Sequence, residues 1–326
     1  MGLWKLRLSM LATLAAIFGL TTLVFAVVLT WVGYFSLTTI AILVVTLNIA
    51  QWLFAPYLVG SLYRVREMKP DENPKLHQIV SELSHKSKIN TPKLMLAQIP
   101  LPNAFAYGSP ISGSRVAVTQ GLLNNLNEGE VEAVLGHELG HLKHRDVQIM
   151  MVVSFLPALC YYIGYTLMLS GMFGGNQRNN NGYGALIGIG FMGFSWVLNL
   201  FTLYISRLRE YYADRHSVSI VDDGATKLST GLAKIVNASS RTVLTRQQQE
   251  QMKNFSSFKS LFIANPETAK EDAASINAFQ SNQQLVEDIL AKKLTFGDKL
   301  IEALSTHPNI VKRLRTLQEL SKNPNA

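Results

Sequence analysis

The chain has 326 residues, of which 48% are hydrophobic and only 16% are charged, and its formal net charge is +8. This composition argues against an ordinary soluble protein and indicates an integral membrane protein. The positive charge suits a surface that faces anionic lipid. No basic patch interleaved with aromatic residues indicates a nucleic-acid partner. The single cysteine, Cys160, excludes a disulfide framework within the chain and argues against a thiolate metal ligand.

Three long stretches carry no Asp, Glu, Lys or Arg: they lie between Arg7 and Arg64, between Asp146 and Arg178, and between Arg178 and Arg207. Each can cross a hydrocarbon core of about 30 Å, which needs about 20 helical residues. The first stretch is long enough for two crossings. We therefore expect four transmembrane helices, at about 8–32, 37–58, 147–171 and 183–206.

Lys and Arg residues gather at the outer ends of both expected hairpins and are scarce in the two connecting turns. Because basic flanks tend to stay on the cytoplasmic side, we expect both termini and the segment between the hairpins to be cytoplasmic. The first apolar stretch exceeds the usual signal-peptide core of about 7–15 residues. We therefore expect an uncleaved anchor in a multi-pass protein of the cell membrane.

The segment after Arg64 has the pattern of a soluble α+β domain. Apolar residues at helical spacing predict a helix over 73–88, and short apolar runs predict strands at 93–97, 103–108 and 114–118. A small sheet can lend its edge strand to a peptide substrate. The second run fits such an edge or a strand that only packs, and its candidate residues are Asn103, Ala104, Phe105, Ala106 and Tyr107.

A His-Glu-x-x-His motif lies at residues 137–141, within a predicted helix that starts near residue 128. Residues four apart lie one above the other on a helix, so His137 and His141 can bind one tetrahedral zinc ion. Glu138 then falls beside the metal, where its carboxylate can take a proton from zinc-bound water. His144 is about two turns beyond His137 and is not expected to reach the same ion.

A third ligand is still needed, and Glu210 and Asp214 follow the last predicted span. They are four residues apart on a continuing helix, so their carboxylates share a face. One could bind the metal while the other accepts the free N–H of a metal-binding imidazole. A solvated, charged helix end with weak ion pairs fits the sequence equally well.

Together these residues resemble the HtpX-type membrane metalloproteases, which are related more distantly to the CaaX prenyl proteases. The resemblance covers the first hairpin and 64–220, returns near 305–317, and departs in the polar segment 241–284. It rests on four motifs: His137-Glu138-Leu139-Gly140-His141, Arg209-Glu210-x-x-Ala213-Asp214, Asn103-Ala104-Phe105-Ala106 and Ser305-Thr306-His307-Pro308.

The resemblance implies one Zn²⁺ per chain, held by His137, His141 and Glu210. It implies that Glu138 is the general base and acid and that Asp214 supports His137.

The same resemblance makes 103–107 the edge strand for substrate. In the CaaX-protease relatives a late His and an Arg six residues on stabilise the oxyanion, and His307 and Arg313 have that spacing. His307 could equally be a structural residue at a helix entry.

The expected fold is a mostly α membrane protein with four transmembrane helices and a cytoplasmic α+β zincin-like catalytic domain that contains a small sheet. Its expected parts are a transmembrane hairpin (1–63), a catalytic part with the His-Glu-x-x-His helix (64–146), a second transmembrane hairpin (147–206), and a cytoplasmic part with the third zinc ligand and C-terminal helices (207–326).

The expected function is that of a membrane-integrated zinc endopeptidase that cleaves misfolded or damaged membrane proteins in quality control. Its partners would be polypeptide substrates and the lipid bilayer, with no nucleic acid. Two alternatives are a CaaX-type processing protease and a non-catalytic membrane scaffold or transporter component. Ion-coupled transporters usually carry a charged residue within a span, which is lacking here. A soluble zincin tethered by hydrophobic anchors is a third.

Overall fold

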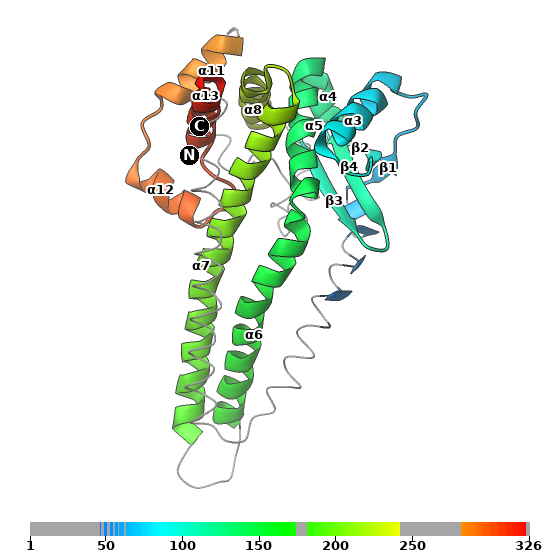
Figure 1. Ribbon diagram of the computed structural model, residues 1–326. Coiled ribbons are helices and arrows are strands. Elements are labelled where there is room, and N and C mark those ends of the chain that lie inside the picture. The colour runs from blue at the N-terminus through cyan, green and yellow to red at the C-terminus, as the bar shows by residue number, and fades with distance from the viewer. Residues whose placement is uncertain are drawn as a thin grey trace. The chain divides into compact units, whose positions relative to one another are not determined.

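A computed structural model describes residues 63–173, 181–241 and 282–323, together with scattered positions between 46 and 61 (Figure 1). The expected span at 8–32, most of the span at 37–58 and nearly all of the polar segment 241–284 lie outside the described residues. The chain divides into two compact units. The first contains Leu53–Val147 and Arg207–Ala326, and the second contains Gln148–Ser206.

The first unit contains a four-stranded mixed sheet in the order β1-β2-β4-β3. Strands β2 (Lys93–Ala97) and β4 (Gly113–Thr119) pair in parallel, while β3 (Ala104–Ser109) pairs antiparallel with β4. These three confirm the predicted strands. β1 (Val65–Glu67) was not predicted, because three residues that stay largely exposed leave no apolar pattern to read. β3 is thus an edge strand of the sheet.

Two helices of the first unit also follow the sequence prediction, α3 (Pro74–Ser87) and α5 (Glu128–Lys143), and a short helix, α4 (Gln120–Asn125), precedes α5. A capping box fixes the start of α5. The Asn127 side chain accepts from the backbone N–H of Glu130 at 2.9 Å, and the Glu130 carboxylate accepts from the backbone N–H of Asn127 at 2.9 Å. This pairing satisfies two N–H groups that a helix start leaves without partners within the helix.

The apolar face of α5 is the centre of the core, since Val131, Val134, Leu135 and Leu139 are all buried. It packs against α3 and the sheet on one side and against α8 on another. The other helices of this unit are α8 (Gly224–Arg241), α11 (Asn282–Ala291), α12 (Phe296–Ala303) and α13 (Ile310–Lys322).

Two long helices carry the apolar stretches: α6 (Asp146–Phe173) and α7 (Asn181–Ile220). Both are long and apolar enough to cross a membrane. In the most apolar 18-residue segment of each helix, only 39% is buried in α6 and 28% in α7. The core helix of a soluble protein would be mostly buried, so these values favour membrane insertion. Two of the four expected spans are therefore supported. α7 continues as one helix past residue 206 into the charged segment.

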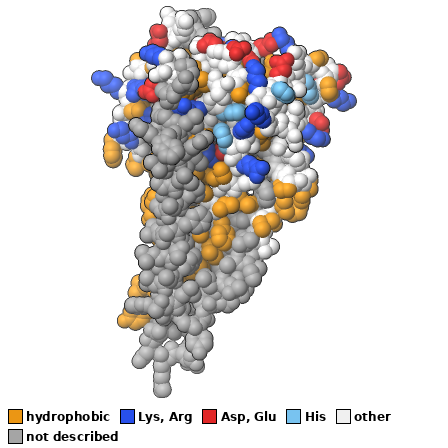
Figure 2. Space-filling model, in the orientation of Figure 1, with side chains coloured by type: hydrophobic (Ala, Val, Ile, Leu, Met, Phe, Trp, Pro, Cys, Tyr) orange, Lys and Arg blue, Asp and Glu red, His pale blue; other side chains and the backbone are white. Residues whose placement is uncertain are grey.

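Within the second unit, α6 and α7 approach closely at small residues. A Cβ added to Gly188 would lie 2.5 Å from the carbonyl oxygen of Gly164, and one added to Gly171 would lie 2.5 Å from the backbone nitrogen of Ala185. Small residues of this kind let helix backbones pack in a membrane. The described residues of this unit include no Lys, Arg, Asp or Glu, and Figure 2 shows apolar side chains on part of its surface.

Candidate metal centre

Small residues let α5 lie close against the 207–220 part of α7. A Cβ added to Gly136 would lie 3.0 Å from Ser217 Oγ, and one added to Gly140 would lie 3.0 Å from Ala213 Cα. The Ser217 hydroxyl also donates to the carbonyl of Ala133 at 2.6 Å. Because these glycines sit beside the motif histidines, their packing brings the His-bearing face of α5 to the carboxylates of α7.

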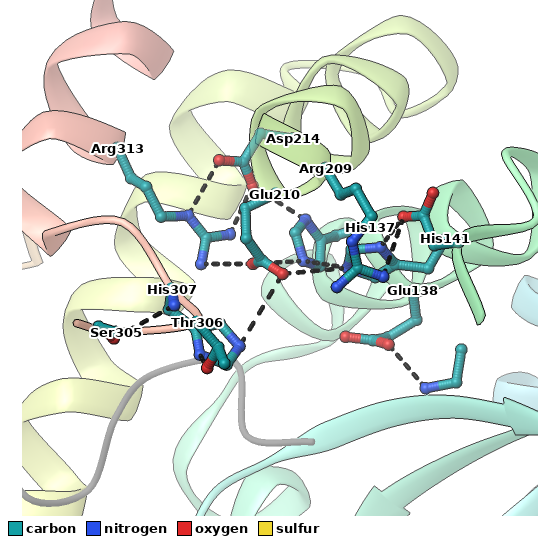
Figure 3. Close-up of polar contacts among 12 residues, drawn as sticks. His137, Glu138, His141, Arg209, Glu210, Asp214, Ser305, Thr306, His307 and Arg313 are labelled. Atoms are coloured by element: carbon teal, nitrogen blue, oxygen red, sulfur yellow. Dashed lines mark hydrogen bonds and ion pairs between the residues drawn. The ribbon is translucent and has the colours of Figure 1, made fainter. Parts of the chain in front are cut away.

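His137, His141 and Glu210 converge on one point (Figure 3), and their potential ligand atoms lie within 4.8 Å of one another. The two Nε2 atoms are 3.2 Å apart. His137 Nε2 lies 3.6 Å from Glu210 Oε2, and His141 Nε2 lies 3.6 Å from Glu210 Oε1. Tetrahedral zinc with bonds of about 2.0–2.1 Å separates its ligand atoms by about 3.3 Å. The residues present therefore fit a zinc ion.

Both imidazoles are held from behind by carboxylates. His137 Nδ1 lies 2.9 Å from Asp214 Oδ1, and His141 Nδ1 lies 2.5 Å from Asp146 Oδ2. Such contacts fix the ring orientation and leave Nε2 to face the metal position. Both carboxylates are buried. Asp146 is the first residue of α6, and the left-handed backbone of Arg145 (φ 55°) turns the chain between α5 and α6.

The Arg313 guanidinium on α13 links the two acidic residues of α7. Its Nε and Nη2 donate to the Asp214 carboxylate at 3.0 and 2.6 Å. Its Nη1 lies 3.2 Å from Glu210 Oε2. Arg313 is 1% exposed, so these charges are paired away from water. Two parallel bonds to one carboxylate give this pairing a defined geometry.

His307 also faces the centre, from the segment between α12 and α13. Its Nε2 lies 3.9 Å from Glu210 Oε1, and its Nδ1 lies 3.0 Å from Thr306 Oγ1. The backbone N–H of His307 donates to Ser305 Oγ at 3.2 Å. This network orients the ring, so that a residue far away in sequence lies beside the two motif histidines.

Glu138 points to the sheet. Its Oε2 accepts a hydrogen bond from the backbone N–H of Ala106 on the edge strand β3 at 2.7 Å. Burial raises the pKa of Glu138, although the nearby His137 and His141 oppose the rise. The edge-strand candidates Asn103, Ala104, Phe105 and Tyr107 are buried, and Ala106 is partly exposed. The Glu138 carboxylate is thus tied to the strand expected to meet the substrate.

Comparison with known proteins shows the family of this chain. Residues 70–321 match peptidase family M48. The chain belongs to this family. It is therefore a metalloprotease, and its His-Glu-x-x-His helix lies inside the matched region.

The M48 chain is similar over nearly its full length to proteins named as HtpX homologues. It is 39% identical to "Protease HtpX homolog" of Thermoplasma acidophilum, covering 97% of each chain. It is 39% identical to "Protease HtpX homolog 2" of Saccharolobus solfataricus, covering 98% of each. The crystal structure of S. mikatae Ste24p aligns with a TM-score of 0.47 and 16% identity, over 88% of this chain and 66% of that one. A structural likeness of that size supports no functional conclusion.

Two other histidines lie near the M48 motif, outside its metal cluster. His144 contacts the rings of Tyr212 and His216, with centroids 5.6 and 5.8 Å away. His216 Nε2 lies 2.9 Å from Ser87 Oγ. His144 therefore contributes to packing between α5 and α7.

Burial and charge act differently on His137 and His307. Burial lowers the pKa of His137, but the neighbouring carboxylates of Asp214 and Glu210 outweigh it and raise the pKa to about 9. Burial lowers the pKa of His307 to about 4, against the opposing effect of Glu210. Because a metal binds neutral imidazole, zinc would have to displace the His137 proton. His307 is neutral without any metal.

Sequence reasoning missed Asp146 and Thr306 as partners of site histidines. In the sequence Asp146 marks the last charge before an apolar stretch, and a lone acid at that boundary, five residues after His141, is a usable signal. Thr306 belonged to a quoted motif, but nothing in its spacing indicated that it would contact the ring of its neighbour His307.

Proposed function

We propose that the chain is a zinc-dependent, membrane-integrated endopeptidase. The observation that carries this proposal is the convergence of two imidazoles and a carboxylate, with Glu138 beside them and an edge strand within its reach. An endopeptidase needs each of these parts: a metal site, a proton acceptor and a surface that can align a peptide.

His137, His141 and Glu210 would hold the zinc ion, one per chain. When bound, zinc supplies positive charge that makes water more acidic and polarises a carbonyl group. Asp214 and Asp146 keep the two imidazoles turned with Nε2 toward the ion. Arg313 balances the negative charge of Glu210 and Asp214, so we assign it to holding this arrangement as well as to the oxyanion role implied by resemblance.

Glu138 moves the proton. Its carboxylate takes a proton from the attacking water, and it then gives the proton to the leaving amine. Burial raises the pKa of Glu138, and a bound zinc ion would oppose that rise. The Ala106 N–H fixes one carboxylate oxygen while the other stays available.

Strand β3 would bind the substrate, and His307 would stabilise the charge that develops on its carbonyl oxygen. An extended peptide can pair with the backbone of residues 103–107 without regard to its sequence. When the Thr306 hydroxyl donates to His307 Nδ1, the proton of the neutral ring is on Nε2. This atom lies 3.9 Å from Glu210 Oε1, on the side of the metal ligands. A neutral imidazole that donates from Nε2 can stabilise a developing oxyanion.

The membrane placement extends this proposal. The two apolar helices support insertion of 147–171 and 183–206, and the charge pattern of the sequence favours two further spans with the catalytic part in the cytoplasm. A protease that can pair with a peptide backbone irrespective of sequence, and that is anchored in a bilayer, suits misfolded or damaged membrane proteins. We therefore place the enzyme in membrane-protein quality control.

A substrate comparison on the full chain in detergent tests the function. We expect cleavage of an unfolded polypeptide, loss of cleavage after treatment with a zinc chelator, and recovery when zinc is added back. Cleavage that persists in metal-free protein would contradict the zinc mechanism. Processing of a prenylated peptide in preference to the unfolded polypeptide would instead favour the CaaX-type alternative.

Replacing Asp146 tests the support behind His141. Asp146→Asn should weaken zinc affinity by about 10–100-fold, because the carboxylate that orients the imidazole and raises its basicity is lost. Zinc retention during titration with a competing chelator measures the effect. Asp222→Asn, at an exposed position, is the matched control. Equal zinc affinity in both variants would remove Asp146 from the site.

A further inference from the structure

Helix α12 (Phe296–Ala303) and its C-cap Leu304 turn an apolar face outward. The four large apolar residues Phe296, Leu300, Ile301 and Leu304 are 82%, 54%, 46% and 54% exposed. Their spacing puts them on one side of the helix. A helix on the surface of a soluble domain buries such a stripe against the core, so this exposure needs a cause.

The acidic side of α12 faces the protein instead. Asp298 and Glu302 are its only partly buried residues, and the remaining residues of the helix are exposed. The Glu302 carboxylate accepts from the backbone N–H of Asn309 at 3.2 Å and pairs with Lys312 at the start of α13. These bonds fix the rotation of the helix about its own axis, so that its apolar side is held away from the rest of the first unit.

Arg207 fixes the C-terminal end of α12. Its Nη1 lies 2.8, 3.1 and 2.7 Å from the carbonyl oxygens of Glu302, Ala303 and Ser305, to which it donates. Arg207 is also the first charged residue of α7, after its uncharged part 181–206. The end of α12 is thus tied to the point where the proposed span of α7 leaves the hydrocarbon.

We propose that α12 is an interfacial membrane anchor, whose apolar face lies in the boundary between lipid headgroups and acyl chains. A helix of this kind inserts its apolar side by about 5–10 Å and is attracted by anionic lipid. Lys293 and Lys299 are exposed on the same segment and supply the matching positive charge. The anchor rests on the membrane placement of α7 proposed above, and the occupant of the face is that same bilayer.

Single-cysteine labelling of the full chain tests the anchor. In a Cys160→Ala background, Leu300→Cys or Leu304→Cys carries a nitrobenzoxadiazole probe, and the protein is placed in phosphatidylglycerol-containing vesicles with nitroxide lipids. Gln318→Cys, an exposed site on α13, is the aqueous control. Trp196→Cys, in the middle of the α7 span and 60% exposed, is the membrane control.

Probes at residues 300 and 304 should emit at shorter wavelength than the probe at 318. They should be quenched most by a shallow nitroxide, whereas the probe at 196 should respond most to a deep one. Quenching at 300 and 304 no greater than at 318, with 196 still quenched, would overturn the anchor and leave the span intact. Absence of quenching at 196 as well would overturn the membrane placement itself. A blue shift without lipid quenching at 300 and 304 would indicate a protein contact and also contradict the anchor.

Discussion

Glu138→Gln is expected to reduce peptide cleavage by about 10²–10⁴-fold, the usual contribution of a positioned general base. The amide has the shape of the carboxylate, and its oxygen can still accept the Ala106 N–H, but it cannot take a proton from water. Zinc content should stay unchanged, because Glu138 is not among the clustered ligand atoms. Cleavage rate and zinc content measured on the same preparation separate the two effects.

The control for this substitution is Glu132→Gln on the same helix. Glu132 is partly exposed and pairs with Lys227 at 3.0 Å, away from the centre. The Glu132→Gln substitution should leave cleavage nearly unchanged, because it lies away from the metal ligands. A single substitution at the surface usually alters stability by less than about 0.5 kcal/mol. Near-normal proteolysis by Glu138→Gln would remove it from the proton-transfer role.

Arg313→Met should destabilise the first unit by about 3–5 kcal/mol, the usual effect of removing one partner of a buried ion pair. The methionine fills part of the space, but Asp214 and Glu210 would both stay buried without their shared cation. A lower midpoint of thermal unfolding in detergent, measured in metal-free protein, reports the loss.

Arg315→Met is the matched control for that experiment, because Arg315 is exposed on the same helix and, among the described residues, donates to the Leu290 carbonyl at 3.3 Å. Its thermal midpoint should stay near that of the wild type. Equal midpoints for the two variants would mean that Arg313 does not balance the buried carboxylates.

Local patterns predicted the catalytic helix and its sheet. The i, i+4 spacing placed His137 and His141 on one face, and the same spacing joined Glu210 to Asp214. Both inferences depend only on helix geometry, so a sequence is sufficient. The residues alone do not decide whether Glu210 or Asp214 binds the metal, because either carboxylate can act as the ligand or accept the imidazole N–H. In the structure Glu210 lies in the cluster of ligand atoms and Asp214 lies behind His137.

Contacts between distant segments could not be predicted in this way. Resemblance alone brought His307 and Arg313 to the site, since no periodicity links α13 to α5. The contact between Asp146 and His141 depends on a left-handed turn at Arg145, and an arginine carries no signal for that backbone. The outward apolar face of α12 also depends on where Glu302 finds its partners, which only the folded chain reveals.

The zinc content of detergent-purified wild type and Glu210→Ala tests the central claim most directly. The third ligand follows two apolar stretches in the sequence and lies in the last part of α7, so the site depends on α5 and α7 coming together. We expect one zinc per chain in the wild type and in the control Glu132→Ala, and little or none in Glu210→Ala. Stoichiometric zinc in Glu210→Ala would contradict a metal centre built from His137, His141 and Glu210.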